Sequence, residues 1–442
     1  MENLMDKIVS LTKRRGFIFP DSEIYGGMAN AWDYGPLGVE LKNNIKQMWW
    51  KKFVQDRSDI VGIDAALIMN PKVWEASGHL GAGFADELTE CKKCHMRFKK
   101  EDIIEPTCPN CDNKTFTAPT KFNLMFKTFI GPKGEEEQNI AYLRPETAQG
   151  IFTNFKNILD TTHKKIPFGV AQIGKSFRNE ITPGNFIFRT REFEQMEIEY
   201  FIQEKDWQKT FDEWLEMMRN WIKLLGIPSE KITEFDIDAK NLAHYSKKTI
   251  DIEYQFPFGK KELYGLAYRT DFDLKNHSQQ SKIDLGYTDL ESKETFVPHV
   301  IEPSLGVERT VLAVLCEHYH EDTAPTSDGK QEARVVIKFP YWLAPIKVAI
   351  LPLSKKPELA KIAKEIFENI KSEFVVEYDE TQSIGKRYRR QDEIGTPLCV
   401  TVDFETINDK AVTIRERDSM KQTRVTIENL KNELTKLLSH EK

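Results

Sequence analysis

The stretch between residues 121 and 202 restricts the possible folds more than any other part of this chain. It consists of short runs of aromatic and β-branched residues separated by Gly, Pro and Asn. Runs of this kind predict the strands of an antiparallel sheet. Along residues 192–201 the alternation predicts one strand, with its Glu residues on one face and Phe, Met, Ile and Tyr on the other.

Other segments predict helices and strands around this sheet. Amphipathic helices are expected over residues 36–55, 206–225 and 305–320, and strands over 61–69, 250–256 and 262–274. From Pro340 onward, strand and helix patterns alternate, which predicts a compact α/β domain of about 100 residues. We therefore expect a first domain over residues 1–342 and a second over 343–442. Within the first we expect a cysteine-containing insert at 85–118 and a helical insertion at 203–250.

Composition limits the class of protein. The chain has 442 residues, 63 basic and 69 acidic, so an overall basic field for binding DNA is not expected. Its hydrophobic content of 40% argues against a largely disordered chain. The first residues lack the apolar stretch of a signal peptide, and no run is long enough to span a bilayer. We expect a cytoplasmic protein without a membrane partner.

Four of the six cysteines form two close pairs. Cys91 and Cys94 are followed, after thirteen residues, by Cys108 and Cys111. Two CxxC pairs at this separation are typical of a tetrahedral zinc site. Four free thiols or a redox pair are the alternatives, and a reduced compartment favours zinc.

Several arginines are placed to bind anions. Arg178, Arg189 and Arg191 flank a loop between two strand-like runs, and a strand-borne Arg can hold a phosphate through two parallel hydrogen bonds. Gly306 and Arg309 stand at the start of a predicted helix, where backbone N–H groups attract anions. A salt-bridged hairpin and an ordinary helix start are the alternatives.

The predicted C-terminal domain contains a basic run, Lys386-Arg387-Tyr388-Arg389-Arg390. Basic residues around a Tyr suit single-stranded RNA through phosphate contacts and base stacking. The alternative is a solvated charged face.

These stretches together resemble the class II aminoacyl-tRNA synthetases. Phe177-Arg178-Asn179-Glu180 with Phe193 is similar to their motif 2, Gly306-Val307-Glu308-Arg309 to motif 3, and helix 36–55 with the strand before Pro71 to motif 1. The similarity is closest to the dimeric glycyl-tRNA synthetases, from about residue 8 to residue 440. It rests on the segments WDYGPLG at 32–38, EASGH at 75–79, RPETAQG at 144–150 and IEPS at 301–304.

The resemblance implies an α+β fold, in which a class II antiparallel sheet is flanked by helices. It adds a zinc-ribbon-like insert and a C-terminal α/β anticodon-binding domain. It implies ATP-dependent attachment of glycine to tRNA(Gly) through a glycyl-adenylate. The implied cofactors are Mg²⁺ with ATP and a structural Zn²⁺, and the implied assembly is a homodimer formed through motif 1.

The resemblance also assigns site residues. The catalytic residues would be Arg178 and Arg309. The ATP site would comprise Arg178, Asn179, Glu180, Phe188, Arg189, Thr190, Arg191, Glu192, Phe193, Glu262, Leu263, Gly306, Val307, Glu308 and Arg309. The glycine site would comprise Lys99, Glu146, Phe193, Glu194, Gln195, Met196, Glu197, Glu302, Pro303, Ser304, Leu305 and Gly306. The metal ligands would be Cys91, Cys94, Cys108 and Cys111.

One segment departs from the family pattern. Where the family has Phe-Arg-Ala-Asp, this chain reads Phe98-Lys99-Lys100-Glu101. Lys99 keeps the positive charge but lacks the planar fork of Arg, and Arg97 is the alternative contact.

Two other functions compete with the ligase. A non-catalytic, synthetase-like accessory protein that binds nucleic acid could dispense with the ATP arginines, yet Arg178 and Arg309 are present. A zinc-ribbon nucleic-acid binder would account for only the cysteine segment.

Overall fold

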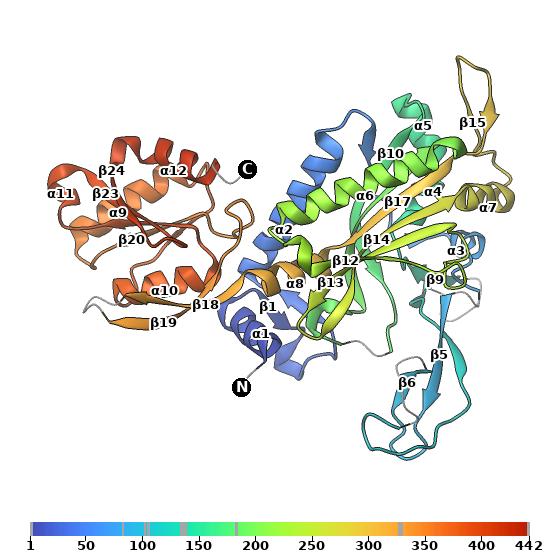
Figure 1. The fold of residues 1–442 in the computed structure, drawn as a ribbon, viewed down its shortest axis with the longest axis horizontal. Coiled ribbons are helices and arrows are strands. Elements are labelled where there is room, and N and C mark those ends of the chain that lie inside the picture. The colour runs from blue at the N-terminus through green and yellow to red at the C-terminus, as the bar shows by residue number, and fades with distance from the viewer. Residues whose placement is uncertain are drawn as a thin grey trace.

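The computed structural model describes residues 3–81, 84–100, 103, 107–132, 139–181, 184–325 and 330–439. Figure 1 shows a larger N-terminal body on the right and a smaller C-terminal body on the left. No helix in the described part of the chain combines the length and the apolar character needed to cross a membrane.

A seven-stranded sheet forms the centre of the larger body. Its strands lie in the order β12, β13, β14, β17, β11, β10, β3. All neighbours are antiparallel except β3, which pairs in parallel with β10 at the edge. The bounds are β3 (Ile60–Gly62), β10 (Phe168–Phe177), β11 (Glu192–Ile202), β12 (Ile232–Asp236), β13 (Lys248–Phe256), β14 (Gly259–Thr270) and β17 (His299–Gly306). The predicted antiparallel sheet is confirmed.

The two faces of this sheet bury different side chains. Met196, Ile198 and Tyr200 of β11 belong to the main hydrophobic cluster. The intervening Glu197 and Glu199 are buried on the other face. Because side chains alternate along a strand, Glu192 and Glu194 share the face of Met196, whereas Glu197 and Glu199 lie on the opposite face. The predicted division of this strand into a glutamate face and an apolar face is therefore wrong.

Helices cover both faces of the sheet. Residues of α1, α2, α6 and α8 join the main cluster, whereas α4, α5 and α7 pack around a smaller cluster against β10 and β11. Their bounds are α1 (Leu4–Arg15), α2 (Pro36–Trp50), α4 (Ala148–Thr153), α5 (Phe155–Thr162), α6 (Trp207–Leu224), α7 (Phe272–Ser281) and α8 (Val307–His318). The apolar spacing along α6 is helical, with Phe211, Trp214, Met218 and Trp221 all buried on one side.

Some predicted elements have different limits in the structure. The helix expected over 36–55 is α-helical to Trp50 and continues as a π-helical turn, Lys51–Gln55. The strand expected over 61–69 is divided between β3 and β4 (Ile68–Met69), which belong to different sheets. The strand expected over 262–274 ends at Thr270, and α7 follows it. The region 203–250 holds α6 but also β12 and the start of β13, both in the main sheet.

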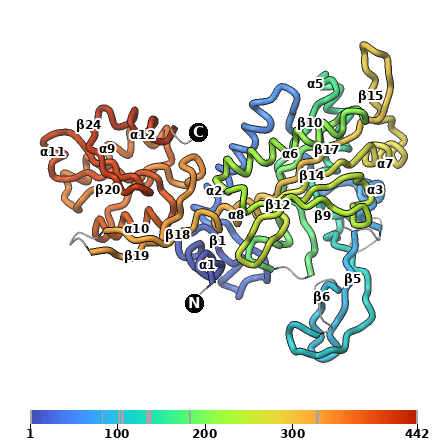
Figure 2. The backbone as a smooth tube through the Cα atoms, viewed as in Figure 1, coloured from blue at the N-terminus to red at the C-terminus, as the bar shows by residue number. Residues whose placement is uncertain are grey.

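Smaller sheets and short helices surround the main sheet. Figure 2 shows that β5 and β6 extend away from the larger body at the bottom of the view. The pairs and triplets are β1–β2, β4–β9–β8, β6–β5–β7, β15–β16 and β18–β19. The bounds are β1 (Ile18–Pro20), β2 (Trp32–Tyr34), α3 (Pro71–Ala76), β5 (Ala85–Glu90), β6 (Arg97–Lys99), β7 (Thr120–Asn123), β8 (Lys127–Phe129), β9 (Ile140–Leu143), β15 (Tyr287–Thr288), β16 (Thr295–Phe296), β18 (Tyr319–Pro325) and β19 (Gln331–Ile337).

The C-terminal body is a five-stranded mixed sheet in the order β21, β20, β22, β23, β24. Its elements are β20 (Val348–Pro352), α9 (Pro357–Ile370), β21 (Val376–Tyr378), α10 (Ile384–Ile394), β22 (Leu398–Val402), α11 (Thr406–Asp409), β23 (Ala411–Glu416), β24 (Gln422–Thr426) and α12 (Leu430–Ser439). The predicted strand–helix alternation is confirmed. Leu343 and Ala344 belong to the main cluster and Val348 to the C-terminal one, so the change of core falls between Ala344 and Val348.

A buried ionic cluster joins the two bodies. Arg334 on β19 donates to Asp322 at 2.6 Å and to Asp392 of α10 at 3.3 Å. Arg415 on β23 donates to both oxygens of Asp392, at 2.9 and 3.2 Å. Arg334 and Asp392 are at most 1% exposed. The hairpin β18–β19 is thereby attached to the C-terminal sheet through one carboxylate.

The basic run of the C-terminal body lies on α10, and most of it is used inside the domain. Arg387 is 1% exposed and donates to backbone carbonyls, among them that of Pro352. Arg389 pairs with Asp392, and Arg390 with Asp379. These arginines therefore stabilise the domain, which neither sequence interpretation had foreseen.

Candidate active site

Three glutamates expected in the amino-acid pocket face one cavity. This cavity has a volume of about 320 Å³, and Glu146, Glu197, Glu302 and Ser304 line it. Glu197 on β11 lies opposite Ser304 on β17, so the sheet register turns both side chains to the same face. All three glutamates are at least nine-tenths buried. The structure thus brings together residues that lie far apart in the sequence.

Hydrogen bonds fix the carboxylate of Glu197. The hydroxyl of Ser304 donates to its Oε1 at 2.7 Å, and Nε2 of Gln195 donates to the same oxygen at 3.2 Å. The hydroxyl of Thr147 donates to Oε2. Both oxygens are therefore held in place, as a preorganised binding group requires.

Arg269 is the only guanidinium in contact with these acids among the described residues, and the sequence analysis did not select it. Its Nε and Nη2 donate to the two oxygens of Asp273 at 2.9 and 3.0 Å, and its Nη1 donates to Glu302. It also forms an ion pair of 3.8 Å with Glu146. Arg269 is 1% exposed. No local pattern singled it out, because β14 carries other charged residues, Lys260, Lys261 and Glu262.

The acids of the cavity carry different pKa values. Burial alone would raise the pKa of Glu146, but His79 and Arg269 outweigh burial and hold that pKa well below its ordinary value. Burial raises the pKa of Glu302 to about 8, with Arg269 opposing the shift and Glu197 adding to it. Burial and the charge of Glu146 also raise the pKa of Glu197. Burial and mutual repulsion therefore disfavour the ionised forms of Glu197 and Glu302, and the ammonium group of a ligand would favour them.

Glu199 is a further acid of this region that the sequence analysis missed. It is fully buried, and neither of its carboxyl oxygens has a hydrogen-bond partner among the described residues. Burial, followed by the charge of Glu302, raises its pKa well above the ordinary value.

A second cavity, of about 400 Å³, adjoins the first and contains the predicted ATP residues. Arg178, Phe193, Glu262 and Arg309 line it. Arg178, Gln195, Glu262 and Ser304 line both cavities, so the two are adjacent. A nucleotide and an amino acid could therefore meet in one site.

The two predicted catalytic arginines are held in place by aromatic rings. The guanidinium carbon of Arg178 lies 5.4 Å from the ring centre of Phe193, and that of Arg309 lies 4.6 Å from the ring centre of Phe188. Arg309 also forms an ion pair of 2.8 Å with Glu262. The charge of Arg309 is the largest cause of a lowered pKa at Glu262. The carboxylate is thus ionised, as a ligand of Mg²⁺ must be.

Lys99, rather than Arg97, faces the second cavity. Its Nζ lies 2.6 Å from Asp86 and 3.7 Å from Glu180, and Lys99 is 6% exposed. Arg97 is exposed and pairs with Glu90. Arg97 and Lys99 are two residues apart on β6 and so lie on the same side of the strand, but only at Lys99 is that side buried. Glu101, the last residue of this segment, lies outside the described residues.

The other predicted site residues fall into three groups. Those that line the two cavities are Phe188, Glu180, Arg189, Thr190, Leu263, Gln195, Gly306 and Glu308. Those that line a neighbouring cavity of about 810 Å³, beside β2 and α2, are Asn179, Arg191, Glu192 and Glu194. Those buried away from the cavities are Met196, Pro303, Leu305 and Val307. The last group supports the site through its backbone and packing rather than by lining it.

Further polar residues that the sequence analysis did not assign surround Glu146. His79 lies 3.4 Å from its Oε2, and Nε2 of Gln149 donates to its Oε1 at 2.9 Å. Gln149 also donates to Asp273 at 2.9 Å. His79 and Gln149 belong to the segments at 75–79 and 144–150, so the similarity to a family pointed to the segments but not to the individual roles.

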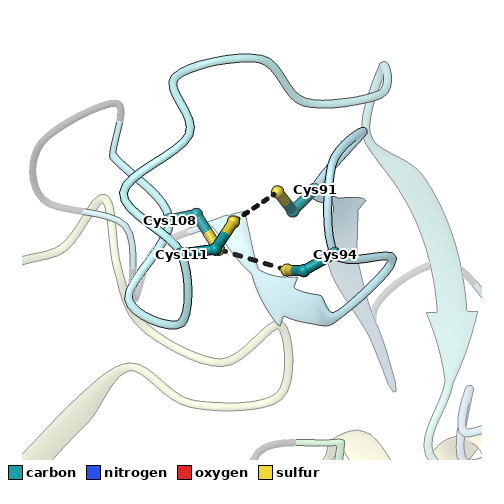
Figure 3. A group of neighbouring side chains, drawn as sticks. All are labelled: Cys91, Cys94, Cys108 and Cys111. Carbon is teal, nitrogen blue, oxygen red and sulfur yellow. Dashed lines mark hydrogen bonds between the residues drawn. The ribbon is translucent and has the colours of Figure 1, made fainter.

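The four cysteines of the insert converge, as Figure 3 shows. Their sulfur atoms all lie within 4.8 Å of one another, and the pairs Cys91–Cys111 and Cys94–Cys108 are each 3.6 Å apart. A tetrahedral zinc with Zn–S bonds of about 2.3 Å separates its sulfurs by about 3.8 Å. The four thiols therefore fit Zn²⁺.

Comparison with known families defines the class of the protein. The model described as "tRNA synthetase class II core domain (G, H, P, S and T)" matches residues 126–319. The model described as "Anticodon binding domain" matches residues 347–437. The first match contains every strand of the central sheet except β3 and most residues that line the two cavities, and the second coincides with the C-terminal body.

Curated relatives narrow the class to one family. The chain is 53% identical to the glycine–tRNA ligase of Acetivibrio thermocellus, covering 97% of each chain, and 53% identical to that of Clostridium acetobutylicum, covering 98% of each. It is 51% identical to the glycine–tRNA ligase of Streptomyces coelicolor, again over 98% of each chain. The chain belongs to the glycine–tRNA ligase family.

Proposed function

We propose that this protein attaches glycine to tRNA(Gly) in two steps. In the first, the carboxylate of glycine attacks the α-phosphate of ATP, which forms glycyl-adenylate and releases pyrophosphate. In the second, the terminal ribose hydroxyl of tRNA takes the glycyl group and AMP leaves. The observation that carries this proposal is the pair of adjacent cavities, one lined by Glu146, Glu197 and Glu302 and the other by Arg309, with Arg178 lining both.

In the proposed ATP site, each of the two arginines contacts one phosphate group. Arg178 would hold the α-phosphate and stabilise the charge that develops there during attack, and Arg309 would hold the γ-phosphate. The ring of Phe193 would stack on adenine. Mg²⁺ bound with ATP would neutralise phosphate charge, and Glu262 is the carboxylate placed to hold it.

In the proposed glycine site, the acidic side chains and the small volume of the cavity select the substrate. Glu146, Glu197 and Glu302 would surround the ammonium group, since each lines the same small cavity. Ser304 holds Glu197 and would lie close to the α-carbon. Lys99 would balance the substrate carboxylate from the side of β6.

The non-catalytic alternative has less support. An accessory protein would not need the two arginines, the magnesium carboxylate and the three pocket acids. All of these line the two adjacent cavities. The zinc-ribbon alternative concerns only the insert, and it leaves the larger cavities without a role.

We also propose a homodimer formed through motif 1, although not every apolar residue of that motif is free to take part. Trp49 on α2 is fully buried within its own chain and cannot form an intermolecular surface. The most exposed apolar side chains before α2 are Ile24, Tyr25 and Met28, at 89%, 87% and 62% exposure. Such a patch is typical of a contact surface. Sedimentation should give twice the chain mass of 51.3 kDa, and a stable active monomer would refute the dimer.

Zinc would have a structural role, and the C-terminal domain would bind the anticodon arm. We expect the protein to act in the cytoplasm, where tRNA is charged. Both domains would be needed for charging, but the two adjacent cavities lie in the larger one.

Glycine-dependent exchange of labelled pyrophosphate into ATP tests the proposed function. We expect exchange with glycine and not with other amino acids, followed by glycyl-tRNA formation when tRNA(Gly) is added. An intact, correctly folded protein that shows no glycine-dependent exchange would refute the ligase and favour the accessory protein.

A further inference from the structure

The amino-acid cavity has a wall that none of the predicted site residues provides. It comes from the connection between β12 and β13, residues 237–247. Ile237, Asn241, Ala243 and Tyr245 of this connection line the same cavity as Glu197. The pocket is therefore bounded by a loop as well as by the sheet.

Tyr245 is the largest side chain of this wall, and it is stacked on Arg269. The guanidinium carbon of Arg269 lies 3.8 Å from the ring centre of Tyr245 and 5.3 Å from that of Phe152. The same guanidinium is bonded to Asp273 and to Glu302. One buried cation thus fixes the position of the Tyr245 ring together with that of a pocket acid.

The backbone on either side of Tyr245 is also fixed. The hydroxyl of Ser246 donates to the carbonyl of Lys248 at 2.8 Å and to that of Tyr268 at 3.2 Å. The N–H of Lys247 donates to the carbonyl of Tyr268 at 3.0 Å, and the N–H of Ile237 to that of Thr249 at 3.0 Å. The wall is therefore attached to both neighbouring strands and cannot withdraw easily from a larger ligand.

We propose that Tyr245 is a specificity-determining residue of the amino-acid pocket. Its ring, fixed on Arg269, forms a rigid wall that admits the two α-hydrogen atoms of glycine and excludes a side chain. This inference rests on the proposed function, because it concerns the amino acid that the ligase activates. A methyl group typically changes discrimination by about 10- to 200-fold, and a rigid wall can use that difference against the larger substrate.

Two substitutions distinguish the role of the Tyr245 ring from that of its hydroxyl group. Tyr245→Phe keeps the stacked ring, and Tyr245→Ala removes it. We measure kcat/KM for pyrophosphate exchange with glycine and with alanine. The ratio of alanine to glycine activity should rise about 10-fold or more in Tyr245→Ala and stay near the wild-type ratio in Tyr245→Phe. Lys247→Ala is the matched control, because Lys247 is an exposed residue of the same connection.

The activities of these variants distinguish a role of Tyr245 in specificity from a role in folding alone. If Tyr245→Ala lowers glycine and alanine activity equally, or leaves both unchanged, Tyr245 supports the structure only and the inference is overturned. Tyr245→Leu, which lacks the ring stacked on Arg269 but keeps some apolar packing, replaces the alanine variant if that one does not fold, and a smaller rise in the ratio is expected. A wild-type protein without glycine-dependent exchange would instead refute the proposed function itself.

Discussion

The ammonium group of Lys42 lies 2.7 Å from a carboxylate oxygen of Glu308. Lys42 is on α2 and Glu308 is in the first turn of α8, and both side chains are nearly inaccessible to solvent. The other oxygen of Glu308 accepts the N–H of Glu194 on β11 at 2.7 Å. The helix of the first motif, the strand of the second and the helix of the third therefore meet at one carboxylate.

Replacing Lys42 by Met should destabilise the protein. The change leaves Glu308 and Glu194 buried without their common cation, and such a loss typically costs about 3–5 kcal/mol. Urea unfolding followed by circular dichroism measures it. Lys46→Met is the control, because Lys46 is more exposed and lies 3.3 Å from Glu194. Equal effects of the two substitutions would contradict the importance of the buried pair.

Replacing Arg309 by Gln should abolish most adenylate formation. The neutral side chain keeps much of the shape but loses the charge that would face the γ-phosphate, so exchange should fall on the order of 100-fold or more. Arg219→Gln, a change in an exposed residue on α6, should leave exchange near the wild-type rate. Full exchange activity in Arg309→Gln would remove this residue from the ATP site.

Replacing Glu302 by Gln should weaken glycine binding while ATP binding persists. The change removes a carboxylate from the pocket and also breaks the charged contact with Arg269. Ser304→Ala removes the hydroxyl that donates to Glu197 and should relax the rejection of alanine. Separate KM values for glycine, alanine and ATP distinguish these effects. An unchanged glycine KM and kcat in Glu302→Gln would show that the glutamates are scaffold.

Glycine binding should improve as pH rises from about 6 to above 8. The pKa of Glu302 is raised to about 8, so its carboxyl gains the charge that attracts an ammonium group only across this range. The glycine KM should fall with rising pH in the wild type and change less in Glu302→Gln. A wild-type glycine KM that does not vary with pH would contradict this role.

The same raised pKa has the opposite effect on the stability of the ligand-free protein. Between pH 4.5 and about 8 the folded state retains a proton on Glu302 that the unfolded chain has lost. The contribution of this group to the free energy of unfolding therefore decreases as pH rises through that window. Glu302→Gln should show a smaller decrease when melting is compared at both ends.

Removing zinc should lower the melting temperature, because the metal is expected to stabilise the insert and not to take part in the reaction. Thiolate ligation couples metal binding to local folding, so a chelator should destabilise the insert first. Elemental analysis should find one zinc per chain, and Cys108→Ser should lose it. Zinc-free protein purified without a chelator would refute the site. Cys316→Ser is the control, because Cys316 is a buried thiol outside the cluster.

Local patterns predicted much of the fold because they record which side of an element is buried. The apolar spacing of α6 and the strand–helix alternation after residue 347 are of this kind. The faces of β11 could not be assigned in this way. A central strand is buried on both sides, so its glutamates are placed by partners from distant segments, such as Thr147 and Ser304.

The candidate site was predictable where residue type implies chemistry. Paired cysteines imply a metal, and the arginines beside strands imply phosphate. Arg269 and Tyr245 were not predictable, because nothing local shows that β14 brings a guanidinium under a distant loop. The opposite error occurred in α10, where Arg387 looked available for RNA but satisfies backbone carbonyls inside the domain.

The ion pairs of Asp392 hold the two bodies of the protein in one relative position. It receives arginines from β19, α10 and β23, so the hairpin that follows α8 and the C-terminal sheet share one rigid connection. The two bodies therefore stand at a set separation before any RNA arrives. A ligase must contact both ends of one tRNA, so this separation selects RNAs by size. An RNA whose two ends are too close together or too far apart could bind one body but not both.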